Sequence, residues 1–99
     1  MLIVWSTEAK NDLKQIWNYL AVEVSTGLAN NQIRKIEDAC RILLEWPLAG
    51  QARDNIILGL RTVAAPPYIL FYRNNEIAIE IIRVLDGRRD IDAIVASTP

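Results

Sequence analysis

The feature that most constrains the fold is a pair of β-prone segments near the C-terminus, separated by two asparagines. The first, residues 68–73, is rich in aromatic and β-branched residues, and the second, residues 76–85, is long and carries few charges. Asn74 and Asn75 lie between them, and asparagine tolerates the positive φ of a two-residue hairpin turn. The pattern predicts a β-hairpin. The nearly continuous apolar character of the second segment favours a central strand, covered along most of its length.

Two amphipathic helices precede this hairpin. Ser6 or Thr7 can cap the first helix, whose apolar positions recur at helical spacing as Ala9, Leu13, Ile16, Trp17, Leu20 and Val24. Residues 25–27 interrupt the pattern, and a second helix is predicted over residues 28–45. It ends at Trp46-Pro47, because proline disfavours a helical residue before it. So short a break makes the two helices antiparallel neighbours in an αα-hairpin.

The rest of the chain supplies strands and connections. Residues 2–5 and 56–63 are β-prone, residues 47–55 and 64–67 are expected to be a loop and a turn, and residues 91–95 form one helical turn or a loose tail. The order is therefore β-α-α-β-β-β. Strands gathered after helices favour an α+β domain over residues 1–99, with an antiparallel sheet packed on the N-terminal αα-hairpin. Two helices leave the other sheet face at least partly open.

Composition narrows the class of function. A net charge of −1 and a pI near 5.3 do not favour broad binding to a polyphosphate, so any nucleic-acid contact must rest on a local patch. The chain shows neither a membrane span nor a signal peptide, which favours a cytoplasmic protein. The lone Cys40 agrees with a reducing compartment.

Several kinds of catalytic and metal site are excluded. With no histidine and one cysteine, the chain lacks the usual zinc ligand sets and cannot build Ser–His or Cys–His catalysis. Asp86, Asp90 and Asp92 could bind a hard metal, but the better interpretation is that they pair with Arg88 and Arg89. No cofactor is expected.

Arginines and tyrosines remain as candidate functional residues. Tyr68 and Tyr72 share a strand face with Leu70, so they are either core residues or part of a partner-binding surface. Arginine suits bidentate recognition of carboxylate or phosphate, and the later part of the chain uses it in place of lysine, at Arg61, Arg73, Arg83, Arg88 and Arg89. Arg83 interrupts an apolar strand; it is either functional or paired internally with Glu80, Asp86 or Asp90.

The order and spacing of several short motifs resemble the ParE branch of the RelE/ParE toxin superfamily. These motifs are Ser6-Thr7-Glu8-Ala9 with Asp12-Leu13, Trp46-Pro47 with Gly50 and Arg53, Gly59-Leu60-Arg61, Tyr68 to Arg73, and Arg83 to Asp90. The likeness covers nearly the whole chain. Members of the branch often have histidine where Asp86 stands. The resemblance implies the toxin of a type II toxin–antitoxin pair, neutralised by a cognate antitoxin.

The two branches of the superfamily differ in mechanism: ParE-like members poison DNA gyrase, whereas RelE-like members cut messenger RNA on the ribosome. RelE-type cleavage uses lysines on the second strand, arginines, and a tyrosine in the tail. The matching positions here are Ile57, Gly59 and Ile69, and residues 91–99 contain no tyrosine, histidine or lysine. Of the residues that RelE-type cleavage uses, only one arginine is retained here, as Arg88 or Arg89. One cation without an acid and a base cannot run that reaction, which argues against RelE-type catalysis.

The expected function is therefore inhibition of gyrase by binding. The expected gyrase contacts are Arg61, Arg83, Arg88, Arg89 and Asp90. The expected contacts to a ParD-like antitoxin are Leu13, Trp17, Leu20, Tyr68 and Tyr72, along the first helix and the open sheet face; operator DNA would be reached only through that antitoxin. Two alternatives stay open: a ribosome-dependent endonuclease with unfamiliar residues, or an inactive homologue that serves only as antitoxin partner in repression.

Overall fold

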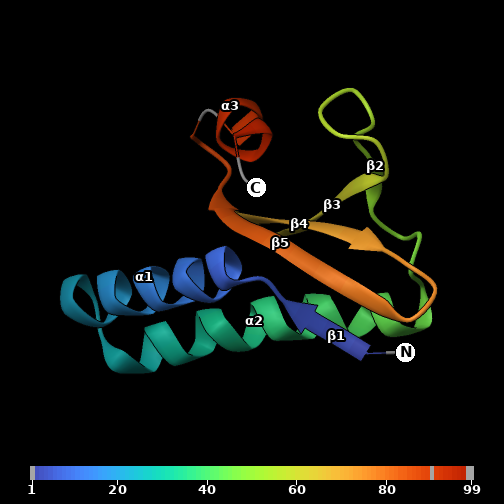
Figure 1. Ribbon diagram of the computed structural model, residues 1–99. Coiled ribbons are helices and arrows are strands. Elements are labelled where there is room, and N and C mark those ends of the chain that lie inside the picture. The colour runs from blue at the N-terminus through green and yellow to red at the C-terminus, as the bar shows by residue number, and fades with distance from the viewer. Residues whose placement is uncertain (1, 90, 98–99) are drawn as a thin grey trace.

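The structure is a computed structural model that describes residues 2–89 and 91–97. Its elements follow in the order β1 (Leu2–Trp5), α1 (Thr7–Glu23), α2 (Thr26–Glu45), β2 (Gln51–Ala52), β3 (Leu60–Ala65), β4 (Tyr68–Asn74), β5 (Ala78–Asp86) and α3 (Ile91–Ala96). The strands form one sheet in the order β1-β5-β4-β3-β2. The α1–α2 hairpin lies on one side of the sheet, and α3 lies on the other (Figure 1). The predicted α+β fold, a sheet packed on an N-terminal αα-hairpin, is confirmed.

The predicted hairpin of β4 and β5 forms the middle of the sheet. The two strands pair antiparallel from Tyr68↔Asp86 to Asn74↔Ile79, with a register shift between Phe71 and Tyr72. β3 pairs antiparallel with β4, and β2 with β3. The helical hairpin returns the chain so that β1 lies parallel to β5. The sheet is thus antiparallel except for this one pair.

The turn between β4 and β5 differs from the prediction. Residues 75–77 form the connection, in place of a two-residue turn at Asn74-Asn75, and no described residue other than glycine has a positive φ. Asn75 Oδ1 accepts hydrogen bonds from the N–H groups of Ile77 (2.9 Å) and Ala78 (2.7 Å). The asparagine side chain therefore closes the turn itself, and no left-handed residue is needed.

The strand predicted over residues 56–63 begins only at Leu60. Residues 53–59 form turns, in which Asp54 Oδ1 accepts from the N–H of Gly59 (2.7 Å) and Gly59 has a φ of +82°. The predicted loop over residues 47–55 also contains the short strand β2, which pairs with β3. Local hydrogen bonds thus prevailed over β propensity in this segment.

Serine side chains set the starts of both long helices. Ser6 Oγ accepts from the N–H of Ala9 (3.0 Å), and Ser25 Oγ accepts from the N–H of Leu28 (3.1 Å). α2 therefore begins at Thr26, two residues before the predicted start. Among the described residues no helix is both long and apolar enough to cross a membrane.

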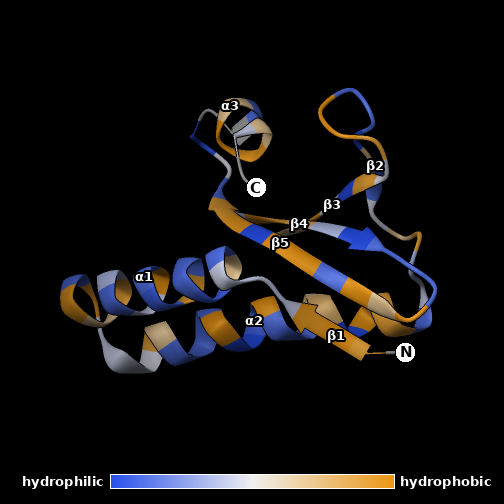
Figure 2. Cartoon of the chain, in the orientation of Figure 1, coloured by the Kyte–Doolittle hydropathy of each residue, from blue (hydrophilic) through white to orange (hydrophobic). Residues whose placement is uncertain are grey.

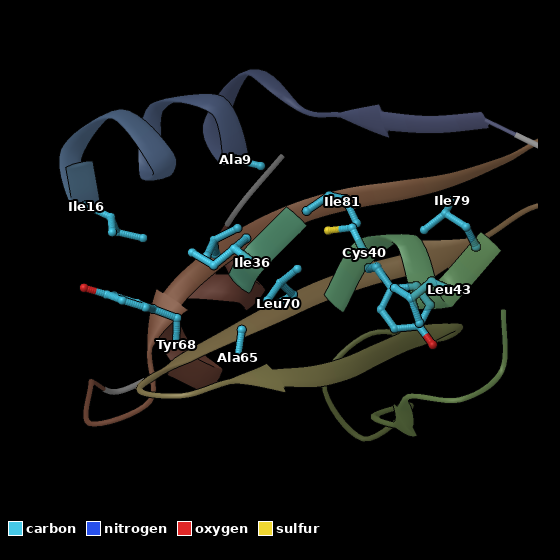
Figure 3. Close-up of a cluster of buried hydrophobic side chains, with 12 residues drawn as sticks. Ala9, Ile16, Ile36, Cys40, Leu43, Ala65, Tyr68, Leu70, Ile79 and Ile81 are labelled. Atoms are coloured by element: carbon cyan, nitrogen blue, oxygen red, sulfur yellow. The ribbon is translucent and has the colours of Figure 1, made fainter. Parts of the chain in front are cut away.

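Two apolar clusters hold the layers together. The larger lies between the sheet and the helices, where Ile36, Cys40 and Leu43 of α2 approach Leu70, Ile79 and Ile81 of the sheet (Figure 3). The smaller lies on the opposite face and comprises Leu60, Phe71, Ile82, Leu85 and Val95 of α3. Each fully buried large side chain contributes roughly 1.5–3 kcal/mol. The face that was expected to be partly open is thus partly covered by α3 and by the isoleucines of residues 56–57.

Candidate functional site: the arginines around strand β5

The first turns of α1 complete the part of β5 that β1 leaves open. β1 pairs with β5 only as far as Ile81. Beyond that point Ser6 Oγ donates to the carbonyl of Ile82 (2.7 Å), and Asp12 Oδ2 accepts from the N–H of Val84 (2.9 Å). Side chains of α1 therefore take the place of a neighbouring strand, which fixes the helix against the sheet.

Arg83 lies at this junction and is held by Asp12. Its Nε donates to Asp12 Oδ2 (2.8 Å) and its Nη2 to Oδ1 (2.9 Å). The side chains of Asp12 and Arg83 are only 7% and 17% exposed. The hydrogen bonds to Asp12 raise the pKa of Arg83. The internal pairing considered from the sequence is therefore real, and the partner among the described residues is Asp12 on α1, far from Arg83 in the chain.

Arg61 also binds protein groups. Its Nη1 donates to the carbonyls of Gly50 (2.7 Å) and Leu48 (3.2 Å). The hydroxyl of Tyr72 on β4 binds the same loop. It donates to the carbonyl of Pro47 (2.9 Å) and accepts from the N–H of Gly50 (2.9 Å). A Cβ at Gly50 would lie 2.6 Å from the Tyr72 side chain, so only glycine fits here. Arg61 and Tyr72 together hold the loop between α2 and β2.

Arg88 and Arg89 follow β5 directly. Arg88 donates through Nε to Asp86 Oδ1 (3.0 Å) and through Nη2 to Oδ2 (2.6 Å), and its backbone N–H also donates to Oδ1 (2.9 Å). These hydrogen bonds lower the pKa of Asp86 to about 2. The Arg88 side chain is nevertheless 84% exposed. Arg89 is exposed, and its side chain forms no ion pair with any residue that the structure describes.

The structure does not bring the predicted arginines into one cluster. Arg61 is the cross-strand partner of Tyr72, whereas Asp86 is the partner of Tyr68. Four residues of β4 separate these positions, which is roughly 13 Å along a strand. Arg83 is occupied by Asp12, and Asp90 lies outside the described residues. Of the predicted arginines, Arg88 and Arg89 are neighbours in the chain and are both exposed.

Two phenols lie beside Arg88. Tyr19, Tyr68, Asp86 and Arg88 line a cavity of about 270 Å³ together with Gln15 and Ile16. Burial, and then the charge of Asp86, raise the pKa of Tyr68. The phenol therefore stays protonated at neutral pH, where it can donate a hydrogen bond but cannot act as a base. No group of three metal-ligating side chains occurs among residues 2–89 and 91–97.

Comparison of the sequence with models of known protein families identifies the family of this chain. The model of the family described as "ParE toxin of type II toxin-antitoxin system, parDE" matches residues 3–91. The chain belongs to the ParE toxin family. The predicted ParE branch of the superfamily is thereby confirmed.

Individual ParE relatives match over most of their length. Toxin ParE1 of Caulobacter vibrioides is 34% identical over 80 residues, covering 81% of this chain and 82% of that protein. Toxin ParE3 of the same organism is 28% identical over 91 residues, covering 92% and 91%. Toxin ParE1 of Mycobacterium tuberculosis is 32% identical over 88 residues, covering 88% and 90%.

The fold itself is also found among solved structures. A chain of the chromosomal ParDE TA system from P. aeruginosa superimposes with a TM-score of 0.75 and 23% identity, covering 87% of this chain and 95% of that chain. At this identity the likeness shows the shared ParE fold.

The two tyrosines predicted as antitoxin contacts in this ParE-family chain are core residues. Tyr72 is completely buried and Tyr68 is 8% exposed, and both belong to the cluster beneath the helices. They do not lie on the opposite sheet face, because alternation along β4 places both on the helix side. Of the two interpretations open from the sequence, the structure supports the core.

The predicted contacts on α1 keep more access. Leu13 and Leu20 are half-buried against the core. Trp17 is also half-buried, and its Nε1 donates to Asn30 Oδ1 of α2 (2.8 Å). The residues on α1 that sequence reasoning missed are the exposed Tyr19 and Val22, at 64% and 81%.

Proposed function

We propose that this chain is the toxin of a type II toxin–antitoxin pair, and that it inhibits DNA gyrase by docking on it in the cytoplasm. Its family membership supports the toxin role. The exposed guanidinium groups of Arg88 and Arg89 at the end of β5 support docking through this turn. Guanidinium groups recognise carboxylates and phosphates in a bidentate manner, so they suit a surface of protein and cut DNA.

The proposed action needs no bond-making by the toxin. Binding traps gyrase on DNA that the enzyme has already cut, and lethality follows from the persistent break. Arg83 and Arg61 act indirectly in this account. Arg83 fixes α1 against β5 through Asp12, and Arg61 fixes the loop that follows α2. Only Arg88 and Arg89 are offered to the target.

A direct test adds the purified protein to gyrase and supercoiled plasmid. Linear, cleaved plasmid that appears after denaturing the enzyme is the expected product. Normal supercoiling without cleaved plasmid, at toxin concentrations well above those of gyrase, contradicts the proposal. If overexpression in the absence of the antitoxin is also harmless while antitoxin binding persists, the chain is the inactive partner considered from the sequence.

We further propose that a ParD-like antitoxin binds along α1, and that operator DNA is reached only through it. The half-buried Leu13, Trp17 and Leu20 and the exposed Tyr19 and Val22 supply the apolar surface. Trp17→Ala should weaken binding to the product of the adjoining reading frame by about 2 kcal/mol or more. Leu58→Ala, at an 84% exposed position in the connection between β2 and β3, is the matched control. Equal affinity of both variants contradicts this placement.

One observation favours a second candidate function, ribosome-dependent cleavage of messenger RNA. The phenols of Tyr19 and Tyr68 lie with Arg88 in one cavity, which combines a cation with possible proton donors. Burial keeps Tyr68 protonated, so this phenol cannot be the base that would take a ribose proton. Codon-specific cuts in a translating extract that disappear in Tyr68→Phe would establish this candidate over gyrase binding.

A further inference from the structure

The cavity beside Arg88, which we call the Arg88 cavity, is built from three elements. It is lined by residues of α1 (Gln15, Ile16 and Tyr19), by Tyr68 at the start of β4, and by Asp86 and Arg88 at and beyond the end of β5. Figure 2 shows that the hydrophobic strand β5 passes into a hydrophilic turn at this end. The cavity therefore joins the surface of α1 to the turn through which docking is proposed.

Tyr68 gives the cavity a hydrogen-bond donor that the fold does not use. The residue is only 8% exposed, and its ring packs in the cluster beneath the helices. Its hydroxyl points out of that cluster (Figure 3) and forms no hydrogen bond with a described residue. Burial, and then the charge of Asp86, raise the pKa of the phenol, so the hydroxyl keeps its proton at neutral pH. A hydroxyl that is held in place by a buried ring and left unpaired suits an external acceptor.

Arg88 supplies a second unused donor. Its Nε and Nη2 bind the two oxygens of Asp86, whereas its Nη1 donates to no described residue. Asp86 Oδ1 also accepts from the backbone N–H of Arg88, so both oxygens of that carboxylate are already hydrogen-bonded. Tyr68 and Arg88 therefore offer donors side by side, and donors suit a ligand that accepts hydrogen bonds.

Charge and shape favour a single carboxylate over a nucleic-acid phosphate. The positive charge of Arg88 is balanced by Asp86, and the whole chain has a net charge of −1, so a polyphosphate gains little attraction here. One acidic side chain needs no more than the two donors. Ile16 supplies an apolar part of the wall, against which the methylene groups of an acidic side chain can pack.

We propose that the Arg88 cavity binds the carboxylate of an aspartate or glutamate on the protein surface of gyrase. Arg88 Nη1 and the Tyr68 hydroxyl both donate to this carboxylate, and such charge-assisted hydrogen bonds select its position as well as its charge. Tyr68 is thus a further contact residue beside Arg88. This inference rests on the proposed docking on gyrase and deepens it, because it assigns the contact to the gyrase protein and not to the cut DNA.

The first test uses a probe that does not depend on gyrase, the peptide acetyl-Ala-Glu-Ala-amide. Nuclear magnetic resonance of the purified chain follows the Arg88 Nε–H signal and the Tyr68 ring signals at constant ionic strength. Both should shift as the peptide is added. The matched peptide acetyl-Ala-Gln-Ala-amide, which lacks the charge, should bind at least tenfold more weakly. Dimethyl phosphate, which represents a phosphodiester, should also bind more weakly than the glutamate peptide.

Variants isolate the two donors. Tyr68→Phe keeps the buried ring and removes only the unused hydroxyl, so it should fold normally and bind the glutamate peptide about fivefold more weakly or worse. Arg88→Gln should weaken binding at least as much, and Arg73→Gln, at an exposed position on β4, is its matched control. The losses in Tyr68→Phe and Arg88→Gln should not add in the double variant, because both side chains contact one carboxylate.

The second test measures the affinity of the chain for gyrase in the absence of DNA. The wild type and Arg73→Gln should bind equally well, because the contact is to protein. Tyr68→Phe should again lose about fivefold or more, the cost of one hydrogen bond to a charged group.

Four outcomes overturn the inference, and they separate it from the proposed function. Equal affinity of the wild type and Tyr68→Phe, for the peptide or for gyrase, removes the carboxylate contact; gyrase inhibition still stands if the wild type accumulates cleaved plasmid. No binding of the wild type to gyrase, with or without DNA, removes the proposed function itself. Binding only in the presence of DNA, with dimethyl phosphate preferred to the glutamate peptide, assigns the cavity to DNA. A loss in Tyr68→Phe that affects only antitoxin binding assigns it to the antitoxin.

Discussion

Asp12 of α1 and Arg83 of β5, 71 positions apart in the chain, form an ion pair with two hydrogen bonds, and the same carboxylate accepts the N–H of Val84. The Asp12 carboxylate thus pairs with the Arg83 guanidinium and also accepts a backbone hydrogen bond from the edge of β5. Because both side chains are largely removed from water, breaking this contact removes two charge-assisted hydrogen bonds from a partly buried site, where water replaces them poorly. This contact fixes the orientation of the helical hairpin on the sheet.

Replacing Asp12 by alanine should therefore destabilise the fold strongly. We expect a loss of about 3 kcal/mol in the free energy of unfolding, the lower end for breaking a buried pair, because Arg83 keeps some exposure. Asp38→Ala is the matched control, since Asp38 and Arg41 are paired on the exposed surface of α2, where such pairs contribute about 0–1 kcal/mol. Urea unfolding measures the free energy of unfolding of both variants. Equal losses in Asp12→Ala and Asp38→Ala would contradict a special role of the Asp12–Arg83 pair.

The Tyr72 hydroxyl should stabilise the loop between α2 and β2. Tyr72→Phe removes a donor to Pro47 and an acceptor for Gly50, which we expect to cost about 1–3 kcal/mol. Tyr68→Phe serves as control, because the Tyr68 hydroxyl points out of the buried cluster (Figure 3) and makes no hydrogen bond to a described residue. The midpoint of thermal unfolding should fall clearly in Tyr72→Phe and stay unchanged in Tyr68→Phe.

Cys40 should make stability fall in alkaline solution. Burial, and then the charge of Glu37, raise the pKa of the Cys40 thiol from 9.0 to about 12. Above pH 9 the unfolded thiol loses its proton while the folded one keeps it, so the folded state is disfavoured as pH rises. Urea unfolding should lose about 1 kcal/mol between pH 9 and 10 from this group. Cys40→Ala should lack that part of the slope; an unchanged slope would contradict it.

The Asp86–Arg88 pair can be tested by titration. Hydrogen bonds from Arg88 hold the pKa of Asp86 at about 2, below its ordinary 3.8. A lowered folded pKa stabilises the fold above pH 4, and that contribution is lost as pH falls toward 2. Carboxyl resonances should report a higher pKa for Asp86 in Arg88→Gln, which loses the guanidinium but keeps the backbone N–H bond, and a smaller rise in Arg89→Gln, which removes only a charge that is not hydrogen-bonded to Asp86. Similar values in all three proteins would exclude the pairing.

The predictable part of the fold was the part with strong periodicity. The β4–β5 hairpin, both long helices and the helix-ending Trp46-Pro47 follow from spacing and from proline geometry. The misses occurred where a single polar side chain decided the backbone. Asn75 closes the turn and Asp54 holds residues 54–59 out of β3, and neither effect appears in apolar spacing.

The candidate site was less predictable, because the partners of its arginines are distant in sequence. Arg83 was rightly considered for internal pairing, yet only the fold brings Asp12 to it. Nothing in the sequence distinguished Arg61 from Arg88, but Arg61 donates hydrogen bonds to the carbonyls of Leu48 and Gly50. The buried tyrosines show the same difficulty, since alternation on β4 gives a shared face without saying which face the helices cover.

The measurement that tests the central claim most directly compares two double variants in the gyrase assay. Arg88→Ala with Arg89→Ala removes the exposed pair at the end of β5, and Arg34→Ala with Arg73→Ala removes two exposed arginines elsewhere. We expect the wild type and the second variant to accumulate cleaved plasmid, and the first to need at least tenfold more protein while remaining folded at the assay temperature. Equal potency of both variants, or no cleaved plasmid with the wild type, would contradict docking through this turn.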